Sequence, residues 1–320
     1  VCHMHAHAHD RISRYHHLAY DLGMSRSNSE GVNSLNLLEN AYDLHVHTAP
    51  DITGRRLDDF DMAERARSAG MKGFAIKCHQ FQSGGRAALV RRQYPEINAV
   101  GGITLNNSVG GLNPMAVEMA ARMGSKIVWL PTVNSMHQKQ YLEQTGEARP
   151  YGAGGVSAVP IQDIPVLVDG ALSQDALDVL DVIRQFDLVL ATGHISPKES
   201  VALIRAGHEM GLKKMIATHV SFPMTSLSME EQQICIACGA VMEQSYYTCC
   251  WTGVPLAHIS SQIREAGCHN VILSTDMGQS TSRDPVTALN EFAERLIREG
   301  GFTEREIHTM VCDVPTTLVE

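Results

Sequence analysis

Two histidines one residue apart stand at the end of a short apolar run, in the stretch "YDLHVHTAPD" that covers residues 42–51. Successive side chains of a strand point to opposite faces, so His45 and His47 are expected to face the same way, about 6–7 Å apart along the strand. At that spacing both imidazole rings can reach one metal ion. A half-buried strand can also carry His-x-His for structural reasons alone. The pair therefore indicates a metal site only if further ligands come from elsewhere in the chain.

Polar residues that could ligate a metal or a substrate end four other apolar runs: Lys77 and His79 in 72–79, His194 in 187–195, His219 in 213–220 and Asp276 in 270–277. A polar side chain late in an apolar strand is costly unless it is hydrogen-bonded, paired or ligated. Separate histidines could each be hydrogen-bonded within a core. Five of them at the same end of their strands, with a lysine and an aspartate, instead favour one shared metal site.

The elements that must position these residues follow a repeated pattern after residue 40. Eight apolar runs predict strands, at 41–48, 72–79, 98–106, 126–133, 187–195, 213–220, 240–247 and 270–277. Amphipathic stretches predict helices between them, as at 57–70, 113–125, 173–186, 196–211 and 255–267, and several of these begin with Ser, Asn-Pro or Asp or end at glycine, as helix caps do. Most strands begin about 25 to 30 residues after the previous one, which is the length of one βα unit.

Eight βα units predict a (β/α)8 TIM barrel of the α/β class. The alternative, a doubly wound open sheet, is less consistent with the sequence because no G-x-G-x-x-G follows any predicted strand. The one long interval contains residues 136–170, rich in Gly and Pro, and predicts a loop insertion at the fourth βα junction. In a TIM barrel the chemistry lies at the C-terminal ends of the strands, where the polar residues above are found.

The domain organisation predicted is a barrel at 36–320 preceded by an extension at 1–35. His3, His5, His7 and His9 alternate in this extension, which can chelate metal in solution but has no apolar pattern that would order it. We therefore expect it to be disordered or loosely attached to the barrel.

Composition excludes several functional classes. The formal net charge is −9 and no dense Lys/Arg run is present, so a nucleic acid or an anionic membrane is not an expected partner. No apolar stretch approaches the roughly 18 residues that a membrane span needs. The first residues lack the pattern of a secretory signal, and a cytoplasmic location is expected. Eight cysteines in 320 residues do not suggest a disulfide scaffold, and Cys235 and Cys238 are interpreted as buried thiols rather than a zinc site.

The ligand order resembles a known family. H-x-H on the first strand, His on the fifth and sixth and Asp on the eighth is similar to the amidohydrolase superfamily of metal-dependent TIM-barrel hydrolases, over residues 41–320. The closing "MVCDVPTTLVE" resembles the terminal "NPAxLL" helix of that family. The segments "GLNP", "TGHISP" and "LSTDMGQ" resemble a functionally unassigned branch of it.

The resemblance implies a binuclear metal centre, most often of zinc. His45, His47 and Asp276 would hold one ion, and His194 and His219 the other; a single ion is the simpler alternative. Neutral imidazole and carboxylate suit Zn²⁺, with Mn²⁺, Fe²⁺ and Ni²⁺ as alternatives.

The bridge between the two ions is where this sequence departs from the family. Many members use a carboxylated lysine or a Glu from strand four, whereas "KIVWLPTVN" has neither at its strand end. Lys77 would then supply the bridge as a carbamate. Alternatively, Lys77 stays an ammonium that binds an anionic substrate, and His79 is the extra ligand.

The implied function is that of an enzyme, a metal-dependent hydrolase. A metal-activated water would cleave a C–N or C–O bond in a cyclic amide, a lactone or a related small molecule, with Asp276 as the catalytic proton carrier. Arg55, Arg56, Asn106 and Tyr246 are candidate substrate-binding residues. The alternatives are a lyase or decarboxylase on the same barrel, or a non-catalytic metal-binding protein that uses its His tract. The oligomeric state stays open, with a homo-oligomer among the possibilities.

Overall fold

The computed structural model describes residues 36–147 and 160–320. The His-rich extension predicted at 1–35 lies outside the described residues, as do residues 148–159 of the predicted insertion.

All eight predicted strands are present and form one parallel sheet in the order β1-β2-β3-β4-β7-β8-β9-β10. Their bounds are β1 Tyr42–Val46, β2 Gly73–Ile76, β3 Asn98–Thr104, β4 Ser125–Trp129, β7 Val189–Ala191, β8 Met215–Ala217, β9 Ala240–Ser245 and β10 Val271–Ser274. The first and last strands meet through a parallel bridge between Val46 and Met277. The backbone N–H groups of Asp276 and His47 donate to the carbonyls of His45 and Met277, respectively. The sheet is thus a nearly closed barrel, which confirms the (β/α)8 prediction and excludes the open doubly wound sheet.

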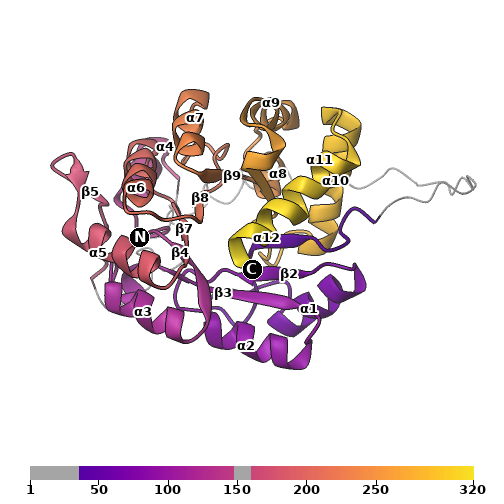
Figure 1. Ribbon diagram of the computed structural model, residues 1–320, viewed down its shortest axis with the longest axis horizontal. Helices are drawn as coiled ribbons and strands as arrows, with labels where there is room; N and C mark the ends of the chain where they lie inside the picture. Colours follow the sequence, from indigo (N-terminus) through magenta and orange to yellow (C-terminus); the bar gives the residue numbers. More distant parts are fainter. Residues whose placement is uncertain (1–35, 148–159) are drawn as a thin grey trace, which may run out of the picture. The chain divides into compact units, whose positions relative to one another are not determined.

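Helices lie around the outside of the strands, except the last, which crosses one end of the barrel (Figure 1). They are α1 Asp59–Ser68, α2 Gly84–Gln93, α3 Pro114–Arg122, α4 Met136–Thr145, α5 Gln174–Gln185, α6 Pro197–Glu209, α7 Met229–Ala237, α8 Tyr246–Trp251, α9 Leu256–Ala266, α10 Pro285–Gly300, α11 Glu304–His308 and α12 Val314–Val319. Short 3₁₀ turns occur at η2 Asn107–Val109 and η3 Cys268–Asn270, and η4 Thr309–Asp313 is π-helical. In the described part of the chain no helix has the length and apolar character of a membrane span.

Local capping sets several helix starts. The Asp58 side chain accepts from the N–H groups of Phe60 and Asp61 to begin α1. Ser196 forms a capping box with Glu199 at the start of α6. Such caps satisfy N–H groups that have no partner within the helix. These capping residues can be recognised in the sequence. The helices predicted at 57–70 and 196–211 are present as α1 and α6.

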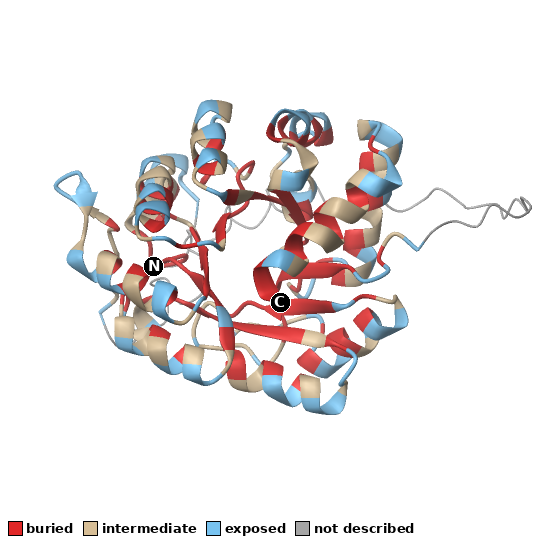
Figure 2. Cartoon of the chain, viewed as in Figure 1, coloured by how far each residue is buried: buried red, intermediate tan, exposed pale blue. Residues whose placement is uncertain are grey.

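Two apolar cores hold the strands in place. One lies between the sheet and the inward faces of the helices, where Figure 2 shows most of the buried residues. The other fills the barrel with side chains such as Leu44, Ile127 and Ile272, against Val314 and Leu318 of α12. The C-terminal helix is therefore part of the barrel core.

The same helix is tied to the N-terminal ends of the strands. Tyr42, the first residue of β1, has its hydroxyl 2.6 Å from Glu320 Oε1 and accepts from Asn98 Nδ2 at 2.9 Å. Since α12 closes this end, the opposite end is the one left for polar side chains.

The insertion predicted as a loop is partly regular. Ser135 Oγ caps α4 by accepting from the backbone N–H of Gln138. The strands β5 Leu167–Val168 and β6 Ala171–Leu172 pair antiparallel, joined by Asp169 and Gly170 at φ 52° and 85°. Two left-handed residues suit a tight hairpin turn. The prediction of a loop was therefore incomplete. It missed α4, whose residues line the cavity and do not show the regular apolar face of the other predicted helices.

Candidate metal centre

The barrel brings together five histidines that are far apart in the sequence. Their imidazole rings form a closed circuit. The ring centroids are 5.5 Å apart for His45 and His47, 4.8 Å for His47 and His79, 6.0 Å for His79 and His194, 5.0 Å for His194 and His219, and 5.9 Å for His219 and His45. The C-terminal ends of parallel strands meet at one mouth of a barrel, so residues placed late in separate strands converge.

A cavity of about 350 Å³ lies at this mouth. Its polar lining includes His47, His79, His194, His219 and Asp276. Part of its wall is apolar or aromatic and comes from several loops, from α4 and from α8: Ile52, Val133, Tyr141, Leu142, Phe222, Met224 and Tyr247. His45 and Lys77 are 0 % and 1 % exposed and do not line the cavity.

Glu243 orients the His45 ring, and the sequence analysis missed it. Glu243 Oε1 lies 2.7 Å from His45 Nδ1 and accepts from Ser274 Oγ, while Oε2 accepts from the backbone N–H of His219. Burial alone would raise the pKa of Glu243, but the contacts with His45, His219 and Ser274 outweigh it and lower the pKa to about 2. An ionised carboxylate only accepts, so His45 donates from Nδ1 and its Nε2, which faces Asp276 and Lys77, is the atom that would bind a metal. In the sequence, the position of this glutamate inside the apolar run 240–247 is the feature that could have identified it as a site residue.

His45, His47 and Asp276 form a set of donors that fits a divalent cation. Asp276 Oδ1 lies 3.0 Å from His45 Nε2 and 3.2 Å from His47 Nε2, and one ligand atom from each of the three residues falls within a span of 4.8 Å. Burial lowers the pKa of His45, but the charges of Asp276 and Glu243 outweigh this and raise it to about 9. The negative field that attracts a proton to His45 equally attracts a metal cation. Two imidazole nitrogens and a carboxylate oxygen are typical zinc ligands.

His194 and His219 are held as neutral imidazoles with Nε2 free. His194 Nδ1 lies 2.7 Å from Gln138 Oε1, a pure acceptor, so Nδ1 carries the proton. His219 Nδ1 lies 2.8 Å from Thr225 Oγ1, whose own proton is donated to the His219 carbonyl. Burial lowers the pKa of His219 to about 4 and that of His194 well below its ordinary value. Neutral rings fixed in this tautomer can ligate a second ion through Nε2.

Lys77 contacts the first ligand group. Its Nζ lies 2.8 Å from His45 Nε2 and 5.6 Å from the centre of the Trp129 ring. Burial is the largest influence on Lys77 and lowers its pKa, against the opposing attraction of Asp276 and Glu243. This position beside His45 is compatible with a carbamate bridge. An ammonium that binds the substrate would have to reach the cavity, which Lys77 does not line.

Backbone strain is concentrated at two of these residues. His219 and Asp276 have φ values of 30° and 54°, a left-handed conformation that is uncommon for residues other than glycine. Gly278, at φ 133°, packs so closely on the His47 backbone that a Cβ there would overlap the His47 carbonyl oxygen. Strained residues of this kind persist where the surrounding structure holds them, and they cluster at functional sites. The "LSTDMGQ" segment therefore has a geometric reason for its glycine.

Of the four predicted substrate-binding residues, only Arg55 lines the cavity. Its Nε and Nη2 both donate to Asp51 Oδ2, at 3.0 and 2.8 Å. Arg56 is exposed and donates to the Ser282 carbonyl. Asn106 is buried in a loop network described below.

Tyr246 requires a correction. Its ring is 1 % exposed and stacks on Phe292 with centroids 5.0 Å apart, whereas Tyr247 lines the cavity. The prediction extended the strand to 247, but β9 ends at Ser245 and α8 begins at Tyr246. Helical residues turn by about 100° each instead of alternating, so the neighbouring tyrosine faces the site.

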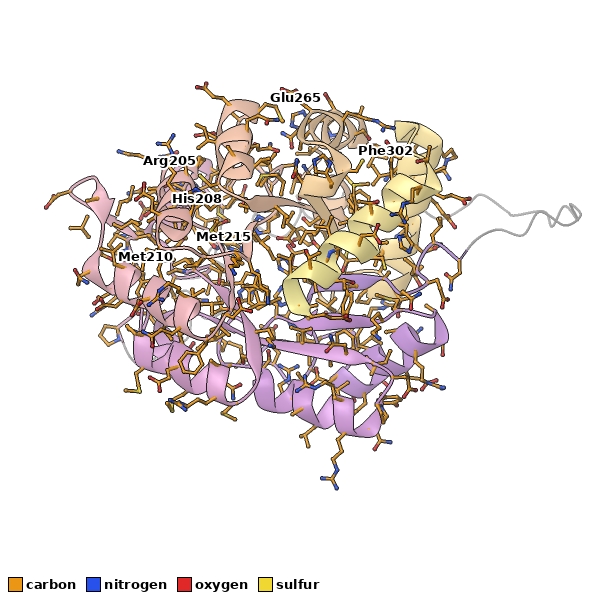
Figure 3. All side chains as sticks on the ribbon, viewed as in Figure 1. Arg205, His208, Met210, Met215, Glu265 and Phe302 are labelled. Atoms are coloured by element: carbon orange, nitrogen blue, oxygen red, sulfur yellow. The ribbon has the colours of Figure 1, made fainter. Side chains whose placement is uncertain are left out.

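Histidines on the outer helices are not part of the site. His208, labelled on α6 in Figure 3, is exposed, and its Nδ1 lies 3.1 Å from the Cys238 carbonyl oxygen. His258 on α9 is exposed as well, and His308 at the end of α11 is partly exposed. This agrees with their positions in helical sequence patterns.

We expect Glu243→Gln to weaken metal binding while the barrel stays folded. The amide would still contact His45 Nδ1 but would no longer hold a negative charge against the ring. Loss of an outer partner of this kind typically costs about 10–100-fold in metal affinity. Zinc affinity can be measured by competition with a chromogenic chelator, with Glu230→Gln at an exposed position of α7 as the matched control. Equal affinity in the two variants would exclude an orienting role for Glu243.

Several solved structures have a fold similar to that of this chain. A structure described as an amidohydrolase from Pseudomonas aeruginosa superposes with a TM-score of 0.58 at 11% identity, covering 89% of this chain and 96% of that one. The probable dipeptidase PvdM from the same organism gives 0.52 at 11% identity, covering 89% and 95%. A 2,6-dihydroxybenzoate decarboxylase from Rhizobium gives 0.50 at 9% identity, covering 88% and 98%. At such low identity these likenesses establish the fold alone.

Sequence comparison identifies the family. No curated protein shows a significant match to the chain. The model of a family of unknown function, DUF6282, matches residues 40–243, which is more than half of the chain and extends from β1 to Glu243. The chain therefore belongs to the DUF6282 family of unknown function, and it has the (β/α)8 barrel fold of the amidohydrolase superfamily.

Proposed function

We propose that the protein is a divalent-metal-dependent hydrolase that cleaves a C–N or C–O bond in a small molecule, such as a cyclic amide or a lactone. The observation that carries the proposal is the convergence of His45, His47 and Asp276 within 4.8 Å, beside two more neutral imidazoles on the same cavity. These ligands come from the barrel itself. The His tract at 1–35 is not needed to build the site, which argues against a protein that only binds metal through that tract.

The metal would be held by His45, His47 and Asp276, with His194 and His219 available for a second ion. When bound, it supplies a nucleophilic water at neutral pH and polarises the bond under attack. The chain's own residues provide the rest. Glu243 fixes the tautomer of His45, and α4, α8 and the loops form the walls that would hold a substrate.

We assign the proton transfer of the proposed reaction to Asp276. Burial would raise its pKa, but the contacts with His45 and His47 outweigh it, so the pKa lies well below its ordinary value and the carboxylate is ionised. A positioned carboxylate can take a proton from the nucleophile and return it to the leaving group.

The cavity wall limits the class of substrate. Arg55 shares its charge with Asp51, which also lines the cavity, so the described residues of the wall offer no concentrated positive charge for a polyanion. Burial, with Asp276 nearby, raises the pKa of Tyr247 to about 12, so its hydroxyl stays a hydrogen-bond donor. A small neutral or singly charged molecule with an apolar part fits these surfaces.

Asp276→Asn tests the proposal. The amide oxygen can still ligate weakly, but an amide cannot accept a proton. We therefore expect substantial retention of zinc with a loss of turnover of about 10²–10⁴-fold, the usual contribution of a general base. Zinc content and hydrolysis of a panel of cyclic amides and lactones can be measured on the same samples. Near wild-type turnover would remove Asp276 from the proton-transfer role.

A decarboxylase is the second candidate, because one of the structural neighbours is a 2,6-dihydroxybenzoate decarboxylase with a TM-score of 0.50. The two reactions differ in the fate of solvent oxygen. A hydrolase incorporates ¹⁸O from labelled water into its product, whereas a decarboxylase releases CO₂ and leaves a product without it.

A further inference from the structure

We infer that His79 presents an Nε2–H group to the cavity, as a hydrogen-bond donor to an oxygen atom of the substrate, and does not ligate a metal. This deepens the proposed function and rests on it, since it assigns a substrate contact within the same site. Asn106, which does not line the cavity, is linked to the His79 ring through the Thr132 hydroxyl.

Four hydrogen bonds set the orientation of the Asn106 amide. Its Oδ1 accepts from the backbone N–H groups of Thr132 and Asn134, at 2.9 and 3.2 Å. Its Nδ2 donates to the His79 carbonyl at 2.9 Å and to Thr132 Oγ1 at 2.7 Å. Flipping the amide would place its NH₂ group against two N–H donors. Asn106, which is 0 % exposed, is therefore a donor to the Thr132 hydroxyl.

The Thr132 hydroxyl accepts from Asn106, so it must donate its own proton to a different acceptor. Thr132 is 0 % exposed, so bulk water is not an acceptor. Within residues 36–147 and 160–320, the remaining partner of Thr132 Oγ1 is His79 Nδ1, at 2.9 Å. If Nδ1 carried a proton, the hydroxyl would be buried without an acceptor, a penalty that disfavours this tautomer by about tenfold or more.

The His79 ring is thus neutral with its proton on Nε2. A second proton would have to occupy Nδ1, where it would again leave the buried Thr132 hydroxyl without an acceptor, so the same hydrogen bonds disfavour the imidazolium. A nitrogen that carries a proton has no lone pair to offer a metal. It offers a donor instead.

The position of the ring suits a substrate contact. His79 lines the cavity, with its ring stacked on His47 at 4.8 Å and edge-on to His194 at 6.0 Å. No described residue hydrogen-bonds its Nε2. His194 and His219 have the opposite tautomer, because their Nδ1 atoms face acceptors. His194 and His219 therefore present a nitrogen lone pair that can bind a metal. His79 presents an N–H group that can donate to a carbonyl or carboxylate oxygen.

Metal content separates the two roles of His79. We expect zinc-loaded His79→Ala and His79→Gln to keep the wild-type ratio of zinc to protein, whereas His194→Ala loses zinc. Turnover should fall by about 10²–10³-fold in His79→Ala, as for loss of one oxyanion donor, and by less in His79→Gln, whose amide still donates.

The tautomer can be observed directly by ¹⁵N NMR of the full-length chain labelled at histidine, independently of activity. We expect an unprotonated Nδ1 at His79 in the wild type and in Thr132→Ser, and a shift toward protonated Nδ1 in Thr132→Val. A protonated Nδ1 in the wild type, or loss of zinc in His79→Ala, would overturn the inference while leaving the proposed hydrolase intact. A wild-type chain that binds no divalent metal would instead contradict the proposed function.

Discussion

His45→Ala and His47→Ala are each expected to lose bound zinc and to reduce turnover to background, while the barrel stays folded. The two imidazoles supply two of the three ligand atoms that lie within 4.8 Å of one another. A methyl group in place of either leaves Asp276 with a single imidazole. Removing a direct ligand should cost more than the roughly 100-fold that loss of an outer partner can cost. Elemental analysis after dialysis against a defined zinc concentration measures the effect.

Exposed histidines give the matched controls for this experiment. His208→Ala and His258→Ala remove imidazoles on outer helices and should leave both zinc content and turnover unchanged. Because His45 and His47 are both buried, a cooperative thermal transition must be recorded for each variant to show that it is folded. His47→Gln serves as an additional variant that removes the imidazole but keeps most of the side-chain volume. Unchanged zinc in folded His45→Ala and His47→Ala would remove this pair from the metal site.

Lys77→Ala is expected to abolish the paired metal site, with loss of one zinc equivalent and most of the turnover. A buried lysine beside imidazoles and divalent ions is destabilised as an ammonium, and burial already lowers the pKa of Lys77. The neutral amine is the form that reacts with CO₂. The resulting carbamate would add a negative charge and two oxygens, enough to bridge ions about 3.5–4 Å apart.

Rescue distinguishes the carbamate from other roles of Lys77. A short carboxylic acid such as propionate, added to Lys77→Ala, should occupy the vacated space and restore part of the zinc content and turnover. Lys72→Ala, at an exposed position just before β2, is the control and should need no rescue. Two zinc equivalents in Lys77→Ala, with weakened binding of anionic substrates only, would instead identify Lys77 as an ammonium that anchors the substrate.

Sequence by itself determined the barrel and the members of its histidine circuit. Strand periodicity and helix caps are local properties, so the eight βα units were readable without knowing what packs against what. His45, His47, His79, His194 and His219 were recognisable because a polar side chain late in an apolar strand is costly without a partner.

Tertiary structure decided which neighbours give these residues their chemistry. Glu243 looks like one polar residue in an apolar run until the barrel places its carboxylate 2.7 Å from His45 Nδ1. Tyr247 replaced Tyr246 at the cavity because α8 begins one residue after β9 ends, a boundary that local pattern does not resolve.

The tautomers of the histidines depended on tertiary contacts most of all. His79 and His194 are the same residue type at equivalent strand ends, yet one faces the Thr132 hydroxyl and the other the Gln138 amide oxygen. Thr132 and Gln138 lie 53 and 56 residues from their histidines in the chain. Whether an imidazole offers a lone pair or a proton is set by the partner on its other nitrogen, and only the folded chain supplies that partner.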